Sequence, residues 1–139
     1  MANRWPPWIE SVRLDSLVDI TSTAYQTVLS LSVTPKIDAR ARIMGSLDAA
    51  IVVGAGDYSV RLQRSTATPT TVHILPAAWP QTITVLELVE DLTAGIQTTW
   101  QLDASVGTLG DTLRCYGGTP YFYNTWIHLT AMPWDGIAY

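Results

Sequence analysis

Cysteine is almost absent from this sequence, in which Cys115 is the single thiol. One cysteine cannot form an internal disulfide, and no paired thiols with the spacing of a zinc site are present. A small secreted disulfide scaffold is therefore disfavoured. A chain of 139 residues can bury roughly 68% of the surface that its unfolded form exposes, so we expect one domain held by its hydrophobic core.

Charge is also scarce. Only 14% of the residues are Asp, Glu, Lys or Arg, the net charge is −4, and Lys36 is the single lysine. An average soluble domain has about 25% charged residues, and a free monomer needs charge and small apolar patches to stay soluble. Because 47% of the residues are hydrophobic and six are tryptophan, we expect much of the surface to face other protein. The same composition excludes intrinsic disorder.

Long apolar runs are missing too. No stretch approaches the roughly 18 residues that a membrane span needs, and the first eight residues lack the apolar core of a secretory signal peptide. We therefore expect no membrane partner, and a chain that is made in the cytoplasm and then stays there or is packed into a particle.

Helical periodicity is absent, whereas the two-residue alternation of β-strands recurs along the chain. The segments with strand character are Val12–Ile20, Leu29–Val33, Ile43–Ile51, Tyr58–Gln63, Val72–Ile74, Ile83–Val89, Ile96–Ala104, Leu113–Tyr116 and Tyr121–Ala131. Turn residues such as those of Gly54–Asp57 and Gly117–Pro120 separate them. This pattern predicts an all-β fold, a jelly-roll-like β-sandwich of about eight strands over residues 11–139.

Residues 1–10 are predicted to form an extended arm before the sandwich. Its distinctive residues are Trp5, Pro6, Pro7, Trp8 and Ile9. The two prolines favour polyproline geometry and cannot pair in a central strand. The arm can fold back over its own domain or anchor the chain to a neighbour, and tryptophan dominates interface hot spots. We predict that these five residues bind a partner protein.

The residues that most often carry catalysis stand alone here. His73 and His128 fall on different predicted strands with no acid or thiol beside them, whereas a metal ion needs three or four ligands. Cys115 follows Arg114, which can lower a thiol pKa. A single cysteine in a strand is nevertheless usually a small hydrophobic residue.

Two further patterns have ordinary explanations. Gly54–Asp57 resembles a dinucleotide-binding loop only faintly, because a strand rather than a helix follows it. Asp48, Asp57, Asp103 and Asp111 offer a carboxylate pair for glycoside hydrolysis only if a groove brings two of them together. We predict no catalytic, cofactor-binding or metal-binding residue, and no enzyme.

The only cluster of basic residues consists of arginines in an acidic chain. It comprises Arg40, Arg42, Arg61, Arg64 and Arg114. They form no basic stripe, so we expect no nucleic-acid partner. Arginine is favoured in ion pairs between subunits. These arginines therefore serve a contact between subunits or lie on a solvated face, and both alternatives stay open.

Aromatic residues are densest in Tyr121–Trp126. Alternation along one strand would send Tyr121 and Tyr123 to one face, and Phe122 and Trp126 to the other. Both faces then need a cover. One is the core, and the second is a symmetry-related copy, the N-terminal arm or a sugar stacked on the rings. We predict a subunit interface made by Tyr121, Phe122, Tyr123, Trp126 and Arg61.

The order of several segments resembles a known family of virion proteins. The segments are Thr23–Pro35, Ala41–Ser46, Tyr58–Arg64 and Thr99–Gly107. Over about residues 20–130 the chain is similar to the trimeric jelly-roll domains of bacteriophage capsid decoration proteins, head fibres and tail-fibre tips, which are similar in fold to tumour-necrosis-factor-like domains. The ending Met132–Tyr139 and the Trp-Pro arm depart from that pattern.

The resemblance implies a homotrimer located in the virion, with no catalytic residues to carry over. The sequence has no coiled-coil or shaft segment, so we expect a capsid decoration (cement) protein that binds the major capsid protein or another virion protein. The alternatives are a tail-fibre or spike tip, or a carbohydrate-binding module that recognises host glycans.

Overall fold

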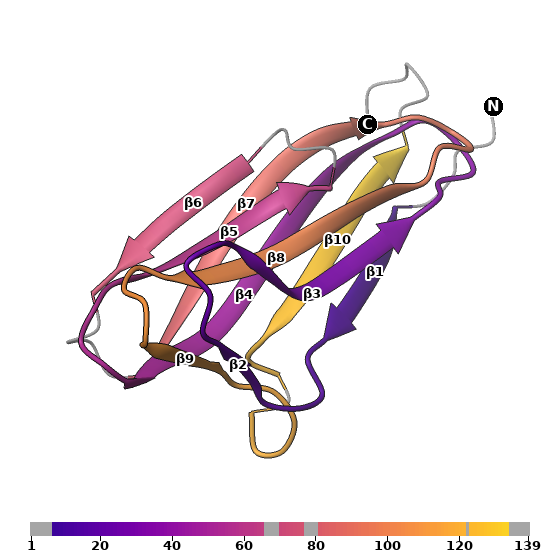
Figure 1. Ribbon diagram of the computed structural model, residues 1–139. Coiled ribbons are helices and arrows are strands. Elements are labelled where there is room, and N and C mark those ends of the chain that lie inside the picture. The colour runs from indigo at the N-terminus through magenta and orange to yellow at the C-terminus, as the bar shows by residue number, and fades with distance from the viewer. Residues whose placement is uncertain (1–6, 66–69, 77–80, 122, 134–139) are drawn as a thin grey trace, which may run out of the picture.

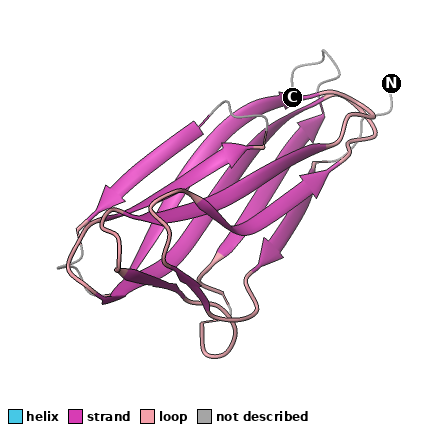
Figure 2. Cartoon of the chain, viewed as in Figure 1, coloured by secondary structure: helices cyan, strands magenta, loops and turns pink. Residues whose placement is uncertain are grey.

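The computed structural model describes residues 7–65, 70–76, 81–121 and 123–133. These residues form two antiparallel sheets packed face to face (Figure 1), with strands and loops but no helix in the described part (Figure 2). A membrane-spanning helix is thus not found among them.

The six-stranded sheet is organised around one long strand, β4. It contains β1 (Trp8–Arg13), β2 (Val18–Ile20), β4 (Ala39–Val53), β7 (Thr82–Leu92), β9 (Thr112–Cys115) and β10 (Trp126–Pro133). The order is β1-β10-β4-β9-β2, and β7 pairs with the opposite edge of β4. Because β4 is 15 residues long, its first half pairs with β10 and its second half with β9.

The four-stranded sheet covers one face of the first. Its strands, in spatial order, are β3 (Gln26–Val33), β8 (Thr98–Val106), β5 (Tyr58–Arg64) and β6 (Thr70–Leu75). All its ladders are antiparallel.

The core lies between the sheets and follows directly from the two-residue alternation of the strands. Ile43 and Leu47 of β4 and Leu62 and Leu102 of the other sheet are completely buried. Each such side chain contributes roughly 1.5–3 kcal/mol by leaving water. Gly45 lets the sheets approach closely, since a Cβ there would lie 3.1 Å from Leu102 Cδ1.

The sequence prediction of an all-β, jelly-roll-like sandwich is confirmed, and the described residues form ten strands in place of about eight. One predicted strand, Val12–Ile20, is wrong as a single element. The chain leaves the sheet after Arg13, where the buried Leu14 donates its N–H to the carbonyl of Thr125 at 3.0 Å. It then forms β2 against β9.

The predicted strand Tyr121–Ala131 is also wrong at its start, because β10 begins only at Trp126. Tyr121 and residues 123–125 lie outside any strand, and Asn124 N–H donates to the carbonyl of Tyr121 at 3.1 Å. The Thr125 hydroxyl donates to the carbonyl of Tyr116 at 2.7 Å. These bonds hold the backbone away from a strand ladder, so the expected alternation of aromatic side chains holds only from Trp126 onward.

Candidate subunit-contact surfaces

The two outer faces of the sandwich differ in chemistry. The outer face of the four-stranded sheet carries mostly hydroxyl and amide side chains, namely Ser30, Ser32, Gln63, Thr99 and Gln101, with the apolar Val72 and Ile74 at its β6 edge. The outer face of the six-stranded sheet carries apolar side chains that are 41% to 70% exposed, namely Ile9, Ile83, Val85, Val89 and Met132. The second face is therefore the one that gains more from being covered by protein.

Charges on the apolar face are paired across strands. Arg42 donates to both carboxylate oxygens of Glu87, at 2.7 and 2.9 Å, and Arg114 binds Asp19 in the same bidentate way, at 2.9 and 3.1 Å. The hydrogen bond from Arg42 holds the pKa of Glu87 below its usual value, and that from Arg114 does the same for the pKa of Asp19. Such exposed pairs add little stability, but they leave few unpaired charges to bury on this face.

An aromatic group lies at one end of the same face. Tyr123 is 73% exposed, and the guanidinium of Arg13 lies 4.9 Å from the centre of its ring. Arg13 is the strand partner of Trp126, whose ring stacks on His128 at 4.1 Å. Burial, and then the charge of Arg13, lowers the pKa of His128. Two predicted interface residues, Tyr123 and Trp126, thus share a neighbourhood around Arg13.

The other predicted interface residues are placed differently. Tyr121 packs on Tyr116 within the loop, with ring centres 4.8 Å apart, and Phe122 lies outside the described residues. Arg61 lies on the outer face of the four-stranded sheet, the opposite side of the sandwich from Trp126. The structure therefore does not bring Arg61 and the aromatic group onto one surface.

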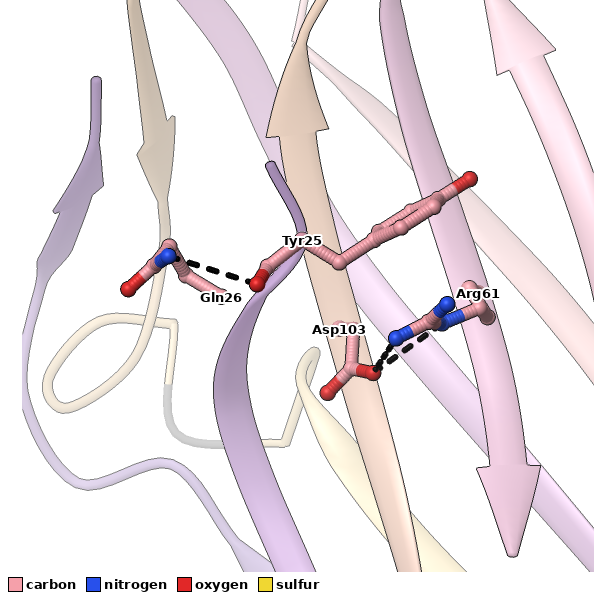
Figure 3. A network of polar contacts seen from close by, with 4 residues as sticks. All are labelled: Tyr25, Gln26, Arg61 and Asp103. Carbon is pink, nitrogen blue, oxygen red and sulfur yellow. Dashed lines mark hydrogen bonds and ion pairs between the residues drawn. The ribbon is translucent and has the colours of Figure 1, made fainter. Parts of the chain in front are cut away.

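Arg61 has partners within its own chain (Figure 3). Its Nε and Nη2 atoms donate to Asp103 Oδ2 at 3.1 and 2.7 Å, and its guanidinium lies 3.9 Å from the ring centre of Tyr25. Tyr25 enters from the segment before β3, where its carbonyl accepts a bond from the side chain of Gln26 at 3.3 Å. The side chain of Asp103 is 3% exposed. The sequence did not identify Asp103 as the partner, because the pairing depends on the register of β5 against β8.

The predicted arm is only partly described. Trp5 and Pro6 lie outside the described residues, and Pro7 is exposed. Trp8 begins β1, pairs with Ala131 and packs half-buried against the core. Ile9 points outward and is 70% exposed. The end of the arm thus belongs to the edge of the six-stranded sheet, where a strand that follows prolines is tolerated.

The carboxylates that the sequence offered for hydrolysis hold the fold together. Asp48 is 1% exposed, and its Oδ2 accepts bonds from Gln81 and Asn124, each at 2.8 Å. Asp111 accepts a bond at 2.8 Å from the backbone N–H of Gly56, in the β4–β5 turn. The carboxylates of Asp48 and Asp111 therefore hold loops in place.

The remaining candidates for a catalytic or metal site, Cys115 and the two histidines, form no common site. Burial raises the pKa of Cys115 to about 12, so its thiol is protonated and unreactive at neutral pH. His73 lies on β6 and His128 on β10, in different sheets. In the part of the chain that the structure describes, no three His, Cys, Asp or Glu side chains gather as a metal ion requires.

No protein-family model and no curated protein sequence matches this chain. Among solved structures it is similar to VP2 of infectious bursal disease virus. A mutant VP2 in derived T=1 particles aligns with a TM-score of 0.50 at 10% identity, over 96% of this chain and 37% of the VP2 chain. The Gx strain of the virus and a VP2 subviral particle give TM-scores of 0.46 and 0.45, at 11% and 12% identity, over 96% of this chain and 39% and 38% of theirs.

The chain therefore spans little more than a third of the length of the proteins that it matches. At this level of identity the likeness establishes a shared fold, a jelly-roll-like β-sandwich that also occurs within a viral capsid protein.

Proposed function

We propose that this chain is a non-enzymatic structural protein of a bacteriophage particle. More narrowly, we assign it to capsid decoration, as a cement protein that binds the major capsid protein or another virion protein and stabilises the lattice. The observation that carries the proposal is the fold shared with a protein of virus particles. The apolar outer face of a chain with only 14% charged residues supports it.

The self-association that we propose is a homotrimer around the aromatic group. Tyr123 and Trp126 stand beside Arg13 on the apolar face, and aromatic and arginine side chains supply most binding hot spots. Closed three-fold symmetry would cover this group in every copy without leading to open-ended association. Native mass spectrometry should give three times the 15.2 kDa mass of the chain. A stable monomer at micromolar concentration would refute the trimer.

Attachment to the capsid is assigned to the arm. Two prolines pre-set an extended shape, so little conformational entropy is lost on docking, and a buried tryptophan contributes a large apolar area. Trp5→Ala should abolish binding to particles and leave the melting temperature unchanged. Trp8→Ala, the matched control, should lower the melting temperature because Trp8 packs on the core. If Trp5→Ala lowers melting and binding persists, the arm seals its own domain and the assignment fails.

Cement activity has its own test. Particles that lack the protein should lose their contents at a lower temperature than complete particles, and added protein should restore the difference, because a ligand that binds only the intact lattice stabilises it. Equal heat resistance with and without the protein would contradict this role.

Glycan recognition is the second candidate, favoured by one observation. Tyr123 is 73% exposed beside a cation, and exposed aromatic faces stack on sugars. Tryptophan fluorescence titrated with glycans of the host surface separates the two functions. Saturable quenching that Tyr123→Ala abolishes would indicate a tail-fibre tip or a carbohydrate-binding module in place of a cement protein.

A further inference from the structure

Two sheet edges lie side by side along one side of the sandwich (Figure 1). The strand β6 ends the four-stranded sheet and pairs only with β5, while β7 pairs only with β4, among the described residues. Between them runs an open groove of about 520 Å³, lined by Val72–Leu75 and Thr82–Val85. Unpaired strand edges of this kind are templates for pairing with another chain.

The two edges expose apolar side chains on opposite faces of the sandwich. Val72 and Ile74 of β6 are 44% and 71% exposed and lie on the outer face of the four-stranded sheet. Ile83 and Val85 of β7 are 53% and 45% exposed and lie on the outer face of the six-stranded sheet. Val72 and Ile74 are β-branched, the type that packs best on a pleated surface, and pairing along β6 would bury part of the apolar area that they leave in water.

No charged residue protects this side. The sequence from Ser65 to Leu86 contains no Asp, Glu, Lys or Arg, in a chain whose net charge is −4. Natural proteins usually block free edges with lysine, other charges or proline within the strand, and β6 has none of these. Two copies of an acidic chain can meet here without opposing one carboxylate to another.

The opposite side of the sandwich is different. Its edge strands are β1, which carries Glu10 and Arg13, and β3, whose outward residues include Ser30 and Ser32. Charged and hydroxyl side chains thus stand on this side of the sandwich, together with Ile9, which is 70% exposed. The absence of any charged residue on β6 singles out the edge of β6 as a contact surface.

We propose that β6 pairs with β6 of a second copy of this chain, antiparallel and across a two-fold axis at His73. In this register Val72 of one copy lies opposite Ile74 of the other, on the same face of the joined sheet. The strand is thus complementary to itself: each exposed apolar residue on that face meets an apolar partner. The two four-stranded sheets become one continuous sheet of eight strands.

This contact goes beyond the proposed trimer and is independent of it. The aromatic group lies on the outer face of the six-stranded sheet, and β6 lies at the edge of the other sheet. If both contacts form, three-fold units are joined through two-fold contacts, which is the combination that builds closed shells. If the trimer fails, the same edge joins two single chains.

The test compares Ile74→Lys with Ile96→Lys. Ile96 is a matched control, because it is 58% exposed in the β7–β8 turn, away from the edge. Wild type should show concentration-dependent association of its base unit in sedimentation experiments: a monomer doubles, and a trimer, which has three such edges, forms larger species. Ile74→Lys should raise the dissociation constant of this contact roughly tenfold, since each contact loses two cross-strand pairs of Ile74 with Val72. Ile96→Lys should leave it unchanged.

The results that overturn the proposal are equally definite. If the wild-type base unit does not associate further, the β6 edge is free or takes a strand of a different protein. If both lysine variants associate with the same dissociation constant, the association uses another surface. The mass of the base unit tests the trimer separately, so failure of one contact is not mistaken for failure of the other.

A second variant tests the register without depending on the lysine substitutions. His73→Cys places a thiol on the proposed axis, where Cα atoms of paired residues lie about 4.5–5.5 Å apart, within the range that a disulfide spans. The native Cys115 is buried and does not compete. Mild oxidation should give a covalent dimer of His73→Cys, whereas Ile96→Cys should stay a single chain. No covalent dimer of His73→Cys would contradict the two-fold register.

Discussion

Gly54 and Gly110 have the same backbone conformation but different surroundings. Their φ angles are +96° and +97°, a region that other L-residues enter at a cost of about 1–2 kcal/mol. A Cβ at Gly54 would lie 1.8 Å from Asp111 Oδ1, whereas a Cβ at Gly110 would meet nothing within 4 Å. The pair therefore separates the cost of the backbone from the cost of displacing Asp111.

We predict that Gly110→Ala lowers the free energy of unfolding by about 1–2 kcal/mol, the backbone cost alone. Gly54→Ala should lower it by at least about 2 kcal/mol more, since Asp111 must also give up its bond to Gly56 N–H. Urea denaturation of the two variants measures the difference. Equal losses would mean that Asp111 does not anchor the β4–β5 turn.

Arg61 and Arg42 allow a partly buried ion pair to be compared with an exposed one. Removing Arg61 leaves Asp103, whose side chain is 3% exposed, without its counter-charge. Since the side chain of Arg61 itself is 23% exposed, Arg61→Ala should cost about 2–4 kcal/mol, somewhat less than a fully buried pair. Arg42→Ala breaks a pair whose side chains are 56% and 42% exposed and should change stability little. Thermal melts of both variants provide the comparison.

If Arg61→Ala has the melting temperature of the wild type but no longer assembles, Arg61 serves a contact between subunits, and its ion pair with Asp103 adds little stability. The sequence placed Arg61 and Asp103 on two predicted strands, Tyr58–Gln63 and Ile96–Ala104, and both segments contain strands. It could not pair them, because alternation fixes the face of a residue and not its neighbour across the ladder.

At the scale of elements, one buried carboxylate holds the loop before β10. Asp48 binds the side chains of Asn124 and Gln81, and its backbone N–H donates to the Thr125 hydroxyl at 3.1 Å. Asp48→Asn replaces one carboxylate oxygen by a donating NH2 group. This group either faces the donating amides of Gln81 and Asn124, or it takes the place of the buried Oδ1, for which the described residues provide no partner. We expect a loss of about 1–3 kcal/mol and faster hydrogen exchange of the Tyr116 amide, which donates to the carbonyl of Asp48.

Asp57→Asn is the matched control for this loop, because Asp57 is exposed in the β4–β5 turn. It should leave both the stability and the exchange rate of the Tyr116 amide unchanged. Exchange of that amide at the wild-type rate in Asp48→Asn would show that the loop is held by other contacts.

This loop also explains which elements the sequence could predict. Segments with clean alternation and turn residues at both ends, such as Tyr58–Gln63, became strands. Val12–Ile20 and Tyr121–Ala131 have similar apolar content, but long-range hydrogen bonds interrupt them, including Leu14 to Thr125 and Thr125 to Tyr116. A local pattern carries no information about such partners. The sequence therefore predicted that strands exist in these segments but not where they begin and end.

At the scale of the whole molecule, the two-residue alternation of the strands predicted the fold class, a β-sandwich, and the structure has one. The partners and the contact residues inferred from the low charge and the aromatic residues stay predictions. Ile83 and Val85, two of the apolar side chains that remain exposed, belong to the predicted strand Ile83–Val89. Only the sheet order shows that one face of this strand is open.

The central claim is that this chain is a structural component of a virus particle. Quantitative peptide mass spectrometry of gradient-purified particles, produced from the genome that encodes the chain, tests it most directly. The account predicts that the chain co-purifies with the particles at a fixed ratio to the major capsid protein, unchanged by further washing. Particles that form and infect normally while the chain stays in the soluble fraction of the lysate would contradict it.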